Sequence, residues 1–301
     1  ILEERSMRVD GNPSSLLSEQ MRARLHAGTA YAVPVIGWRK EIEQLNTADA
    51  RAFYERFYAP DNAVLVVAGA VTLDDVLPLA EAHYGPLTPS SRPRDPRRVA
   101  TDLTVADFDR VEVLADSRVR QASWRRMYRL PQYSRDERRL YAAADVLAEI
   151  IGNGSTGRLY EALVVDKKLA VSVGAYSDTA RLDNGEFVLY ASLTPGSNFT
   201  DVATAMDAVL ADAKNRLPTQ DEMARAKMQL VSDLVYARDS QQSMANIFGQ
   251  AAMLGLTPQE IIDWPNVIES VTAEDVRRAA QLFLQRPHAI DSHLLPQDVA
   301  Q

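Results

Sequence analysis

The sequence of 301 residues contains no cysteine. This absence excludes disulfide bonds, thiolate-held zinc and a cysteine nucleophile. The four histidines follow neither of the metal-binding spacings HxxEH and HxxxH, and no GxSxG motif marks a serine nucleophile. His288 and His293 stand five residues apart on an expected strand, so their side chains should face opposite sides. The residues taken alone therefore contain no complete active site of these kinds.

Long apolar runs and an excess of positive charge are missing as well. The most apolar run, residues 63–71, is far shorter than the ~20 residues that a membrane-spanning helix needs. The formal net charge of −8 argues against nucleic acid as a general partner. The lack of thiols fits an oxidising compartment, so we expect a periplasmic location in preference to a cytoplasmic one.

The sequence does contain an internal repeat. Residues 42–67 align without a gap with residues 268–293, an offset of 226 positions. Typical composition would give roughly one or two identities in a window of this length. Six aligned positions are identical, namely Ile42/Ile268, Glu43/Glu269, Asp49/Asp275, Arg51/Arg277, Phe57/Phe283 and Ala63/Ala289.

Both copies predict a capped helix that leads into a strand. Asn46 and Thr272 each stand three residues before an aspartate, which is the pattern of a helix N-cap. Each helix then meets a proline and an apolar run. The side chains expected to be buried are Ala50, Phe53 and Phe57 in the first copy and Val276, Ala279 and Phe283 in the second. The repeat indicates two similarly folded domains, and the alternative is a coincidental alignment of two unrelated units.

A change of composition divides the chain between the two copies. Residues 88–100 are rich in proline and arginine and are expected to form a linker between a first domain, residues 1–87, and a second, residues 101–301. The expected strands of the second domain are residues 103–114, 119–130, 170–176 and 186–193, the last two joined by an Asp-Asn-Gly hairpin. We therefore expect an α+β fold of two homologous domains, each a mixed or antiparallel sheet covered by helices, with the first domain incomplete.

Three further local patterns are present in the sequence. Ser14 or Ser15 is expected to cap a helix whose Leu17, Met21 and Leu25 share one face. Residues 152–157 match the dinucleotide pattern GxGxxG but follow a helix rather than a strand, so we interpret them as a turn between helices. Eight arginines lie in residues 118–139; they form either a solvated strand edge or a docking face for an acidic partner.

Four motifs in order carry a resemblance to a known family. They are ILEERSMRVDGNP, AYAVPVIGW, FYAPDNAVLVVAGAV with LAEAHYGPL behind it, and GNGSTGRLYEALVVDKKLAVSV. Together they resemble the second half of the first domain and the whole second domain of insulinase/pitrilysin-type zinc peptidases. The similarity is strongest to the short bacterial members, which are related to mitochondrial processing peptidase. This resemblance covers nearly the whole chain and implies a pair of homologous α+β domains.

The resemblance also implies a zinc site. In the family, zinc is held by the two histidines of an HxxEH motif and by a glutamate on a later helix. The segment ILEER places Glu4 at the position of that glutamate, with Glu3 as the neighbouring alternative. The HxxEH motif would lie roughly seventy to eighty residues before Glu4 and therefore upstream of Ile1. We accordingly expect Glu4 to be a zinc ligand, no catalytic residue in this chain, and no activity of the chain by itself.

The family also uses an arginine and a tyrosine seven residues apart to hold substrate in the non-catalytic half or partner subunit. Val164 and Val171 stand at those positions here, so the resemblance implies the zinc-bearing subunit of a heterodimer whose homologous partner carries the Arg/Tyr pair. The histidine that the family places before Pro-Tyr is replaced in residues 28–31. The implied function is a zinc-dependent endopeptidase that cleaves peptides in a chamber between the two subunits. The alternative is a catalytically inactive homologue that acts as a structural or assembly subunit.

Overall fold

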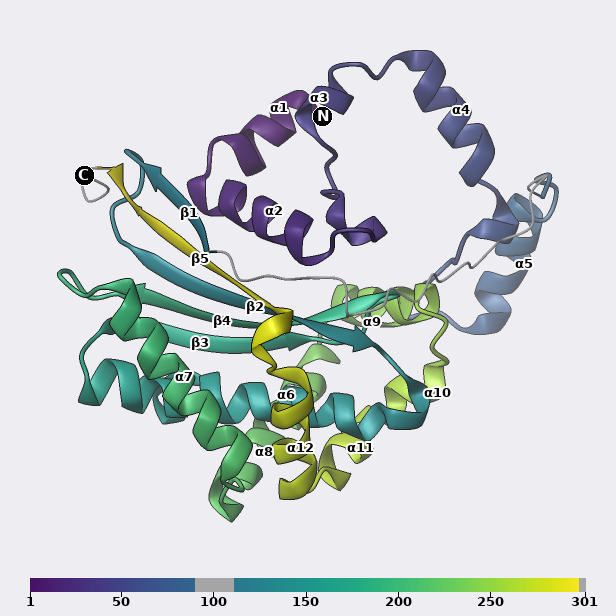
Figure 1. The fold of residues 1–301 in the computed structure, drawn as a ribbon. Helices are drawn as coiled ribbons and strands as arrows, with labels where there is room; N and C mark the ends of the chain where they lie inside the picture. Colours follow the sequence, from purple (N-terminus) through teal and green to yellow (C-terminus); the bar gives the residue numbers. More distant parts are fainter. Residues whose placement is uncertain (90–110, 298–301) are drawn as a thin grey trace. The chain divides into compact units, whose positions relative to one another are not determined.

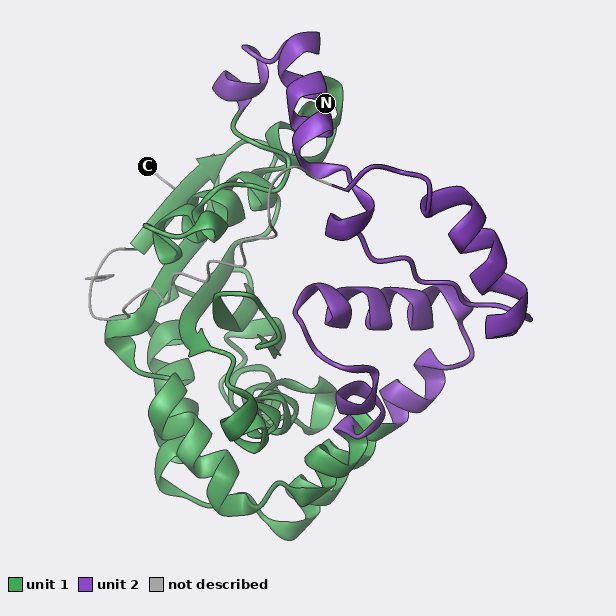
Figure 2. Ribbon diagram, turned by 90° about the vertical axis from the view of Figure 1, so that its right-hand side faces the viewer, with its two compact units in different colours: residues 1–38, 99–231, 265–301 green, residues 39–98, 232–264 purple. Residues whose placement is uncertain are grey.

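The computed structural model describes residues 1–89 and 111–297. The chain divides into two compact units (Figure 2). The first combines residues Ile1–Trp38, Val99–Val231 and Pro265–Gln301, and the second combines Arg39–Arg98 and Ser232–Trp264. Within the described ranges, no helix has both the length and the apolar character needed to cross a membrane.

The first unit is built on one five-stranded mixed sheet with strand order β1-β5-β2-β4-β3. β1 and β5 pair in parallel, and every other neighbouring pair is antiparallel. The sheet confirms the expected mixed sheet covered by helices. The strands are β1 (Val111–Asp116), β2 (Ser123–Gln132), β3 (Ala170–Asp178), β4 (Asn184–Leu193) and β5 (Ala289–Pro296).

Three helices cover one face of this sheet: α6 (Arg138–Gly152), α7 (Phe199–Asn215) and α12 (Ala273–Phe283) (Figure 1). Two further helices, α8 (Gln220–Ala237) and α11 (Trp264–Ser270), follow α7 in the chain. α6 approaches β3 at Gly152, where an added Cβ would lie 2.2 Å from the backbone nitrogen of Ala175. Only glycine allows this approach, because any side chain would push the helix away from the strand.

The other face of the sheet is covered by α2 (Pro13–Leu25), which follows α1 (Leu2–Arg5) and a π-helical turn, Ser6–Asp10. Leu17, Met21 and Leu25 are all buried, as their spacing predicts. Met21 and Leu25 pack in one cluster with Met127, Val188 and Ile290 of the sheet. This packing holds the first residues of the chain over the sheet.

The cap of α2 differs from the expectation. Asn12, and not Ser14 or Ser15, is the N-cap residue, and its Oδ1 accepts hydrogen bonds from the backbone nitrogens of both serines. Pro13 then occupies the first helical position, where its missing N–H costs nothing. An Asn-Pro pair therefore sets the helix start two or three residues earlier than the serines alone predict.

The second unit contains α3 (Arg39–Ile42), α4 (Thr47–Phe57), α5 (Leu73–Tyr84), α9 (Gln241–Met253) and α10 (Pro258–Ile262). The repeat is confirmed at the helix starts, since α4 and α12 both begin with a capping box, Asn46 with Asp49 and Thr272 with Asp275. After α12 the chain continues into β5, as expected. After α4, residues 63–70 form no strand.

The burial expected for the first copy is therefore wrong. Phe53 and Phe57 on α4 are 57% and 38% exposed, whereas Val276, Ala279 and Phe283 on α12 are buried. The two helices have similar apolar spacing, but α12 packs against the sheet layer and the described residues of the second unit contain no sheet. Apolar spacing makes a face available for burial, and a neighbouring layer is needed to bury it.

The connecting segments that the structure describes have the conformations predicted from the sequence. The loop of residues 152–157 forms a 3-10 turn, Gly154–Thr156, between α6 and a π-helix, Tyr160–Asp166, so the turn between helices is confirmed. The hairpin between β3 and β4 is also confirmed. Residues 90–100 of the expected linker and residues 103–110 of the first expected strand lie outside the described residues. The domain boundaries at residues 87 and 101 remain predictions.

Candidate functional site

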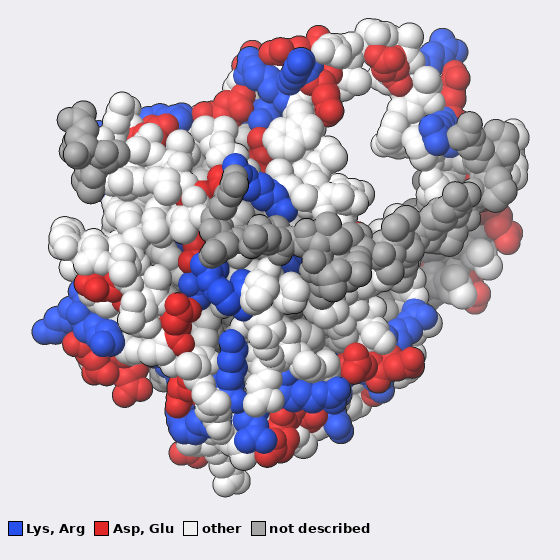
Figure 3. Space-filling view, viewed as in Figure 1, with Lys and Arg blue, Asp and Glu red and all other residues white. Residues whose placement is uncertain are grey.

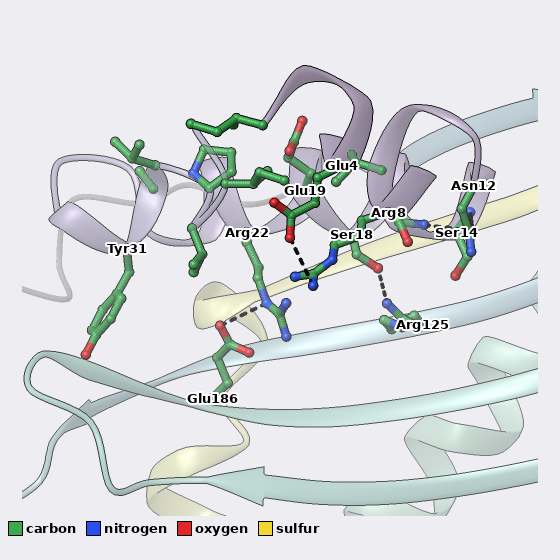
Figure 4. A pocket seen from close by; sticks show the side chains of 18 of the residues that line it. Glu4, Arg8, Asn12, Ser14, Ser18, Glu19, Arg22, Tyr31, Arg125 and Glu186 are labelled. Carbon is green, nitrogen blue, oxygen red and sulfur yellow. Dashed lines mark hydrogen bonds and ion pairs between the residues drawn. The ribbon is translucent and has the colours of Figure 1, made fainter. Parts of the chain in front are cut away.

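A cavity of about 1010 Å³ lies between α1, α2 and the loop of residues 31–36 on one side and the sheet on the other, entirely within the first unit (Figure 4). The sheet and its β3–β4 hairpin contribute Arg125, Arg181 and Glu186 to its lining. The charged lining residues from the helical side are Glu4, Arg8, Glu19 and Arg22. The cavity thus brings together the first residues of the chain and strands more than a hundred residues further on.

Glu4 lines this cavity and Glu3 does not. The Glu4 carboxylate Oε1 lies 3.0 Å from Nη2 of Arg8, one helical turn further on. Its side chain is 43% exposed and remains accessible to a ligand. Of the two neighbouring glutamates, Glu4 is thus the one that reaches the cavity, and its role as a metal ligand stays a prediction.

The residues present do not form a zinc site by themselves. Zinc in proteins takes three or four protein ligands, and nowhere in residues 1–89 and 111–297 do three His, Cys, Asp or Glu side chains gather closely enough to hold a metal. Glu4 supplies one carboxylate. The other lining glutamates bind protein groups, Glu19 the guanidinium of Arg5 at 2.8 Å and Glu186 the ring of His26 at 2.8 Å. Zinc ligation by Glu4 remains a prediction.

Glu186 lies at the bottom of the cavity and is fully buried. Its Oε1 accepts hydrogen bonds of 2.8 Å from Nε2 of His26 and from Nη1 of Arg181, and it lies 3.5 Å from Nε of Arg22. Burial alone would raise the pKa of the Glu186 carboxyl. The hydrogen bond from His26 and the charges of Arg181 and Arg22 outweigh burial and hold the pKa at about 2. Glu186 is therefore an anion at neutral pH.

Tyr31 extends this cluster to the β3–β4 hairpin. Its hydroxyl accepts a hydrogen bond of 3.0 Å from the backbone nitrogen of Leu182. Its ring lies edge-on to the ring of His26, with centroids 5.8 Å apart, and the guanidinium of Arg181 lies 5.4 Å from the Tyr31 centroid. The segment of residues 28–31 thus has a structural role, in spite of its departure from the pattern that the resemblance implied.

Arg125 borders the same cavity from β2. Its Nη1 donates a hydrogen bond to the hydroxyl of Ser18 on α2 (Figure 4). Directly across the ladder from Arg125 stands Tyr190 of β4. Tyr190 in turn lies over Gly174 of β3, where an added Cβ would meet the Tyr190 hydroxyl at 2.2 Å. Burial lowers the pKa of the Arg125 guanidinium, and the nearby charge of Arg22 lowers it further.

Sequence reasoning missed this constellation. His26 and Glu186 are separated by 160 residues, and no motif joins them. The one local signal is Glu186 itself, a carboxylate that directly precedes the apolar run of β4. Val164 and Val171, singled out by the resemblance, do not line the cavity.

The arginine-rich stretch does not form one docking face. Arg126 and Arg129 are 1% and 3% exposed; Arg126 binds Asp291 in a bidentate pair of 2.7 and 2.9 Å, and Arg129 binds Asn184. Over the helices at the bottom of Figure 3, basic and acidic side chains are interspersed. Within the stretch, the strand β2 carries three of the eight arginines, and these serve the interior and the cavity rather than an acidic partner.

The fold defines an α/β protein with a mixed sheet covered by helices, and sequence comparison identifies its family. The family described as Peptidase M16 inactive domain matches residues 44–230, more than half of the chain. The chain therefore belongs to this family, and the resemblance to zinc peptidases of this type is confirmed.

Curated relatives agree with the family. An uncharacterized zinc protease of Mycobacterium leprae is 26% identical over 295 residues, which are 95% of this chain and 62% of the relative. The zinc protease PqqE of Helicobacter pylori is 23% identical over 98% of this chain and 65% of its own length. The beta subunit of the mitochondrial-processing peptidase of Blastocladiella emersonii is 26% identical over 92% and 58%. The chain spans about three fifths of the length of these relatives.

Solved structures share the fold. A protease from Helicobacter pylori superposes with a TM-score of 0.85 at 21% identity, over 98% of this chain and 70% of that one. The peptidase M16 inactive domain from Pseudomonas fluorescens gives a TM-score of 0.77 at 19% identity, over 98% and 68%. At these identities the likeness shows the fold, which confirms the processing-peptidase-like architecture expected from the sequence.

Proposed function

We propose that this chain is part of a zinc-dependent endopeptidase and contributes to it a substrate-holding cavity and one metal ligand, Glu4. The observation that carries the proposal is the position of Glu4, on the wall of a cavity of about 1010 Å³ whose opposite wall is the sheet. Zinc proteases among the relatives support it. The remaining ligands would come from residues outside this sequence.

The chain's own part in this function is to bind and orient the peptide. The cavity is at the upper end of the 300–1,000 Å³ range of ligand pockets, which suits an extended peptide segment better than a compact metabolite. Part of its lining is apolar, with Val33, Pro34, Val35 and Ile36. Another part presents Asn12, Ser14, Ser15 and Ser18, whose side chains can pair with peptide N–H and C=O groups.

The partner is also part of the proposal. Val164 and Val171 are aliphatic and cannot donate hydrogen bonds to a substrate carbonyl, so a homologous subunit with an Arg/Tyr pair would supply those contacts and close the chamber. The name of the mitochondrial relative, subunit beta, indicates that it belongs to an assembly. A periplasmic location would fit the lack of thiols.

The test is Glu4→Gln in the full-length protein, with Glu3→Gln as the matched control. Glutamine keeps the shape of the side chain and removes the anionic ligand. Zinc content by elemental analysis and turnover of a mixed peptide pool should therefore fall together in the Glu4 variant and stay at the wild-type level in the control. Full zinc retention in Glu4→Gln would show that another carboxylate is the ligand.

A second candidate function is a catalytically inactive structural or assembly subunit. It is favoured by the match to a family described as an inactive domain. Measurements on the wild-type full-length protein distinguish the two candidate functions without any substitution. Stoichiometric zinc and chelator-sensitive peptide cleavage support the peptidase, whereas a stable complex with a homologous subunit that cleaves no peptide and holds no zinc supports the structural role.

A further inference from the structure

We propose that Arg125 and the serine hydroxyls around it bind a carboxylate of a peptide that lies in the cavity beside Glu4. The inference rests on the proposed peptide-binding function and names the subsite that would anchor one end of the substrate. Arg125 lines both the large cavity and a smaller pocket of about 190 Å³. Arg125 therefore stands where the two pockets meet, and a peptide lying in the larger cavity would place its end there.

Arg125 forms no direct ion pair, although the charge of Glu186 acts on it from a longer distance. The other arginines of the lining are paired with carboxylates: Arg8 with Glu4 at 3.0 Å, and Arg22 and Arg181 with Glu186 at 3.5 and 2.8 Å. Arg125 makes its hydrogen bond to a neutral hydroxyl, that of Ser18, and no carboxylate of the described chain lies within ion-pair distance of it. A half-buried guanidinium without an anion at ion-pair distance is unfavourable, so this position favours an incoming carboxylate.

The smaller pocket supplies further hydrogen-bond donors for such a group. Five serines line it together with Arg125 and Tyr190, namely Ser14, Ser18, Ser123, Ser192 and Ser292, and no acidic residue does. An ionised carboxylate offers about four lone-pair sites and accepts only, so a ring of hydroxyls beside a guanidinium matches it well. A pocket of about 190 Å³ admits the end of a chain or one acidic side chain and excludes a folded partner.

The donor groups of this subsite are held rigidly enough to discriminate between a carboxylate and a neutral group. Arg125 and Tyr190 face each other across the β2–β4 ladder, and Ser18 belongs to α2, which the buried Met21 and Leu25 fix to the sheet. The remaining N–H groups of Arg125 are thus presented in a fixed orientation before a ligand arrives. Preorganised donors of this kind cost little to order on binding.

The experiment measures binding without cleavage. Full-length protein is kept in a zinc chelator and titrated into three N-terminally fluorescein-labelled peptides of one sequence: the free acid, the C-terminal amide, and an amide extended by glutamate. Fluorescence anisotropy gives each Kd. We expect the free acid to bind wild type about tenfold more tightly than the amide, the size typical of a charge-assisted hydrogen bond.

Arg125→Gln is expected to abolish this tenfold preference, and a wild-type circular dichroism spectrum and melting temperature show that the variant is folded. Arg125→Lys should keep part of the preference because it keeps the charge. Arg120→Gln, at an exposed position three residues before the start of β2, is the matched control and should behave as wild type.

The three peptides distinguish the two possible sources of the carboxylate, an acidic side chain and the C-terminus of the peptide. Recovery of the affinity by the glutamate-extended amide assigns the subsite to an acidic side chain, and recovery by the free acid alone assigns it to the peptide C-terminus; both support the proposal. Equal binding of acid and amide, or equal effects of the Arg125 and Arg120 substitutions, would overturn the subsite and leave peptide binding intact. No binding of any of the three peptides would count against both the subsite and the proposed function.

Discussion

His26 and Glu186 share a fully buried hydrogen bond of 2.8 Å across 160 residues of sequence. His26 closes α2 and Glu186 is the third residue of β4, so the bond joins the end of the N-terminal helix to the sheet. Arg181 and Arg22 add their charges to the same carboxylate. The bottom of the cavity is therefore a network in which one anion holds three cationic or hydrogen-bonding side chains in place.

Removal of that anion should destabilise the protein. In Glu186→Gln the Arg181 guanidinium, whose side chain is 18% exposed, loses its buried anionic partner, and breaking a buried pair in this way costs about 3 kcal/mol. Urea unfolding followed by circular dichroism measures the loss. Glu43→Gln, which breaks the exposed pair of Glu43 with Arg39, is the control and should change the free energy of unfolding by less than about 0.5 kcal/mol. Similar values for the two variants would show that the network contributes little.

The same carboxylate predicts a dependence of stability on pH. The pKa of Glu186 is about 2 in the folded protein against an ordinary value of 4.5. Because the folded value is the lower one, the stabilisation is complete above pH 4.5 and is lost as the pH falls from 4.5 through 2. The free energy of unfolding of wild type and Glu186→Gln should therefore converge over this interval. A difference that stays constant from pH 7 to pH 2 would contradict the assignment.

Asp145 on α6 predicts the opposite trend. Burial raises the pKa of its carboxyl from 3.8 to about 7, although Ser177 of β3 donates a hydrogen bond to it. Its contribution to stability is complete below pH 3.8 and is lost as the pH rises through 7. Asp145→Asn stays neutral and should unfold at a higher temperature than wild type at pH 8 but not at pH 4. The exposed substitution Glu161→Gln should leave the melting curve unchanged at both pH values.

Gly152 tests the contact between α6 and β3. An added Cβ would lie 2.2 Å from the backbone nitrogen and 2.5 Å from the Cβ of Ala175, so in Gly152→Ala the helix must move away from the strand. Overpacking of this kind typically costs 1–3 kcal/mol, and the upper end, about 3 kcal/mol, is expected because the nearest atom is backbone. Gly69→Ala, where nothing lies within 4 Å, should be neutral. Equal melting temperatures of the two variants would refute the close approach.

Local signals in the sequence predicted local structure well. The capping boxes at Asn46 and Thr272 and the buried face of Leu17, Met21 and Leu25 depend on neighbouring residues only, and both are confirmed. The exposed Phe53 and Phe57 could not be foreseen, because spacing alone does not say whether a second layer lies beside the helix.

The sequence singled out one residue that lines the candidate cavity. The motif around Glu4 indicated the residue that lines the cavity, and this came from a resemblance rather than from the chemistry of the segment. Arg125 stood within an arginine-rich stretch whose members have unlike surroundings: Arg126 is buried against Asp291, whereas Arg125 borders the cavity. Alternation along a strand separates such neighbours, but only strand pairing shows which face meets α2.

The position of β5 has a consequence for synthesis. This strand, Ala289–Pro296, lies between β1 and β2, although almost all of the described chain precedes it. During translation, β1 and β2 therefore leave the ribosome long before β5 has been synthesised. Until β5 inserts between them, each of these strands has an unpaired edge. Unpaired edges of this kind are where nascent chains associate wrongly. Closure of the sheet is thus one of the last events of folding, and a chain that stops before residue 289 would keep both edges open.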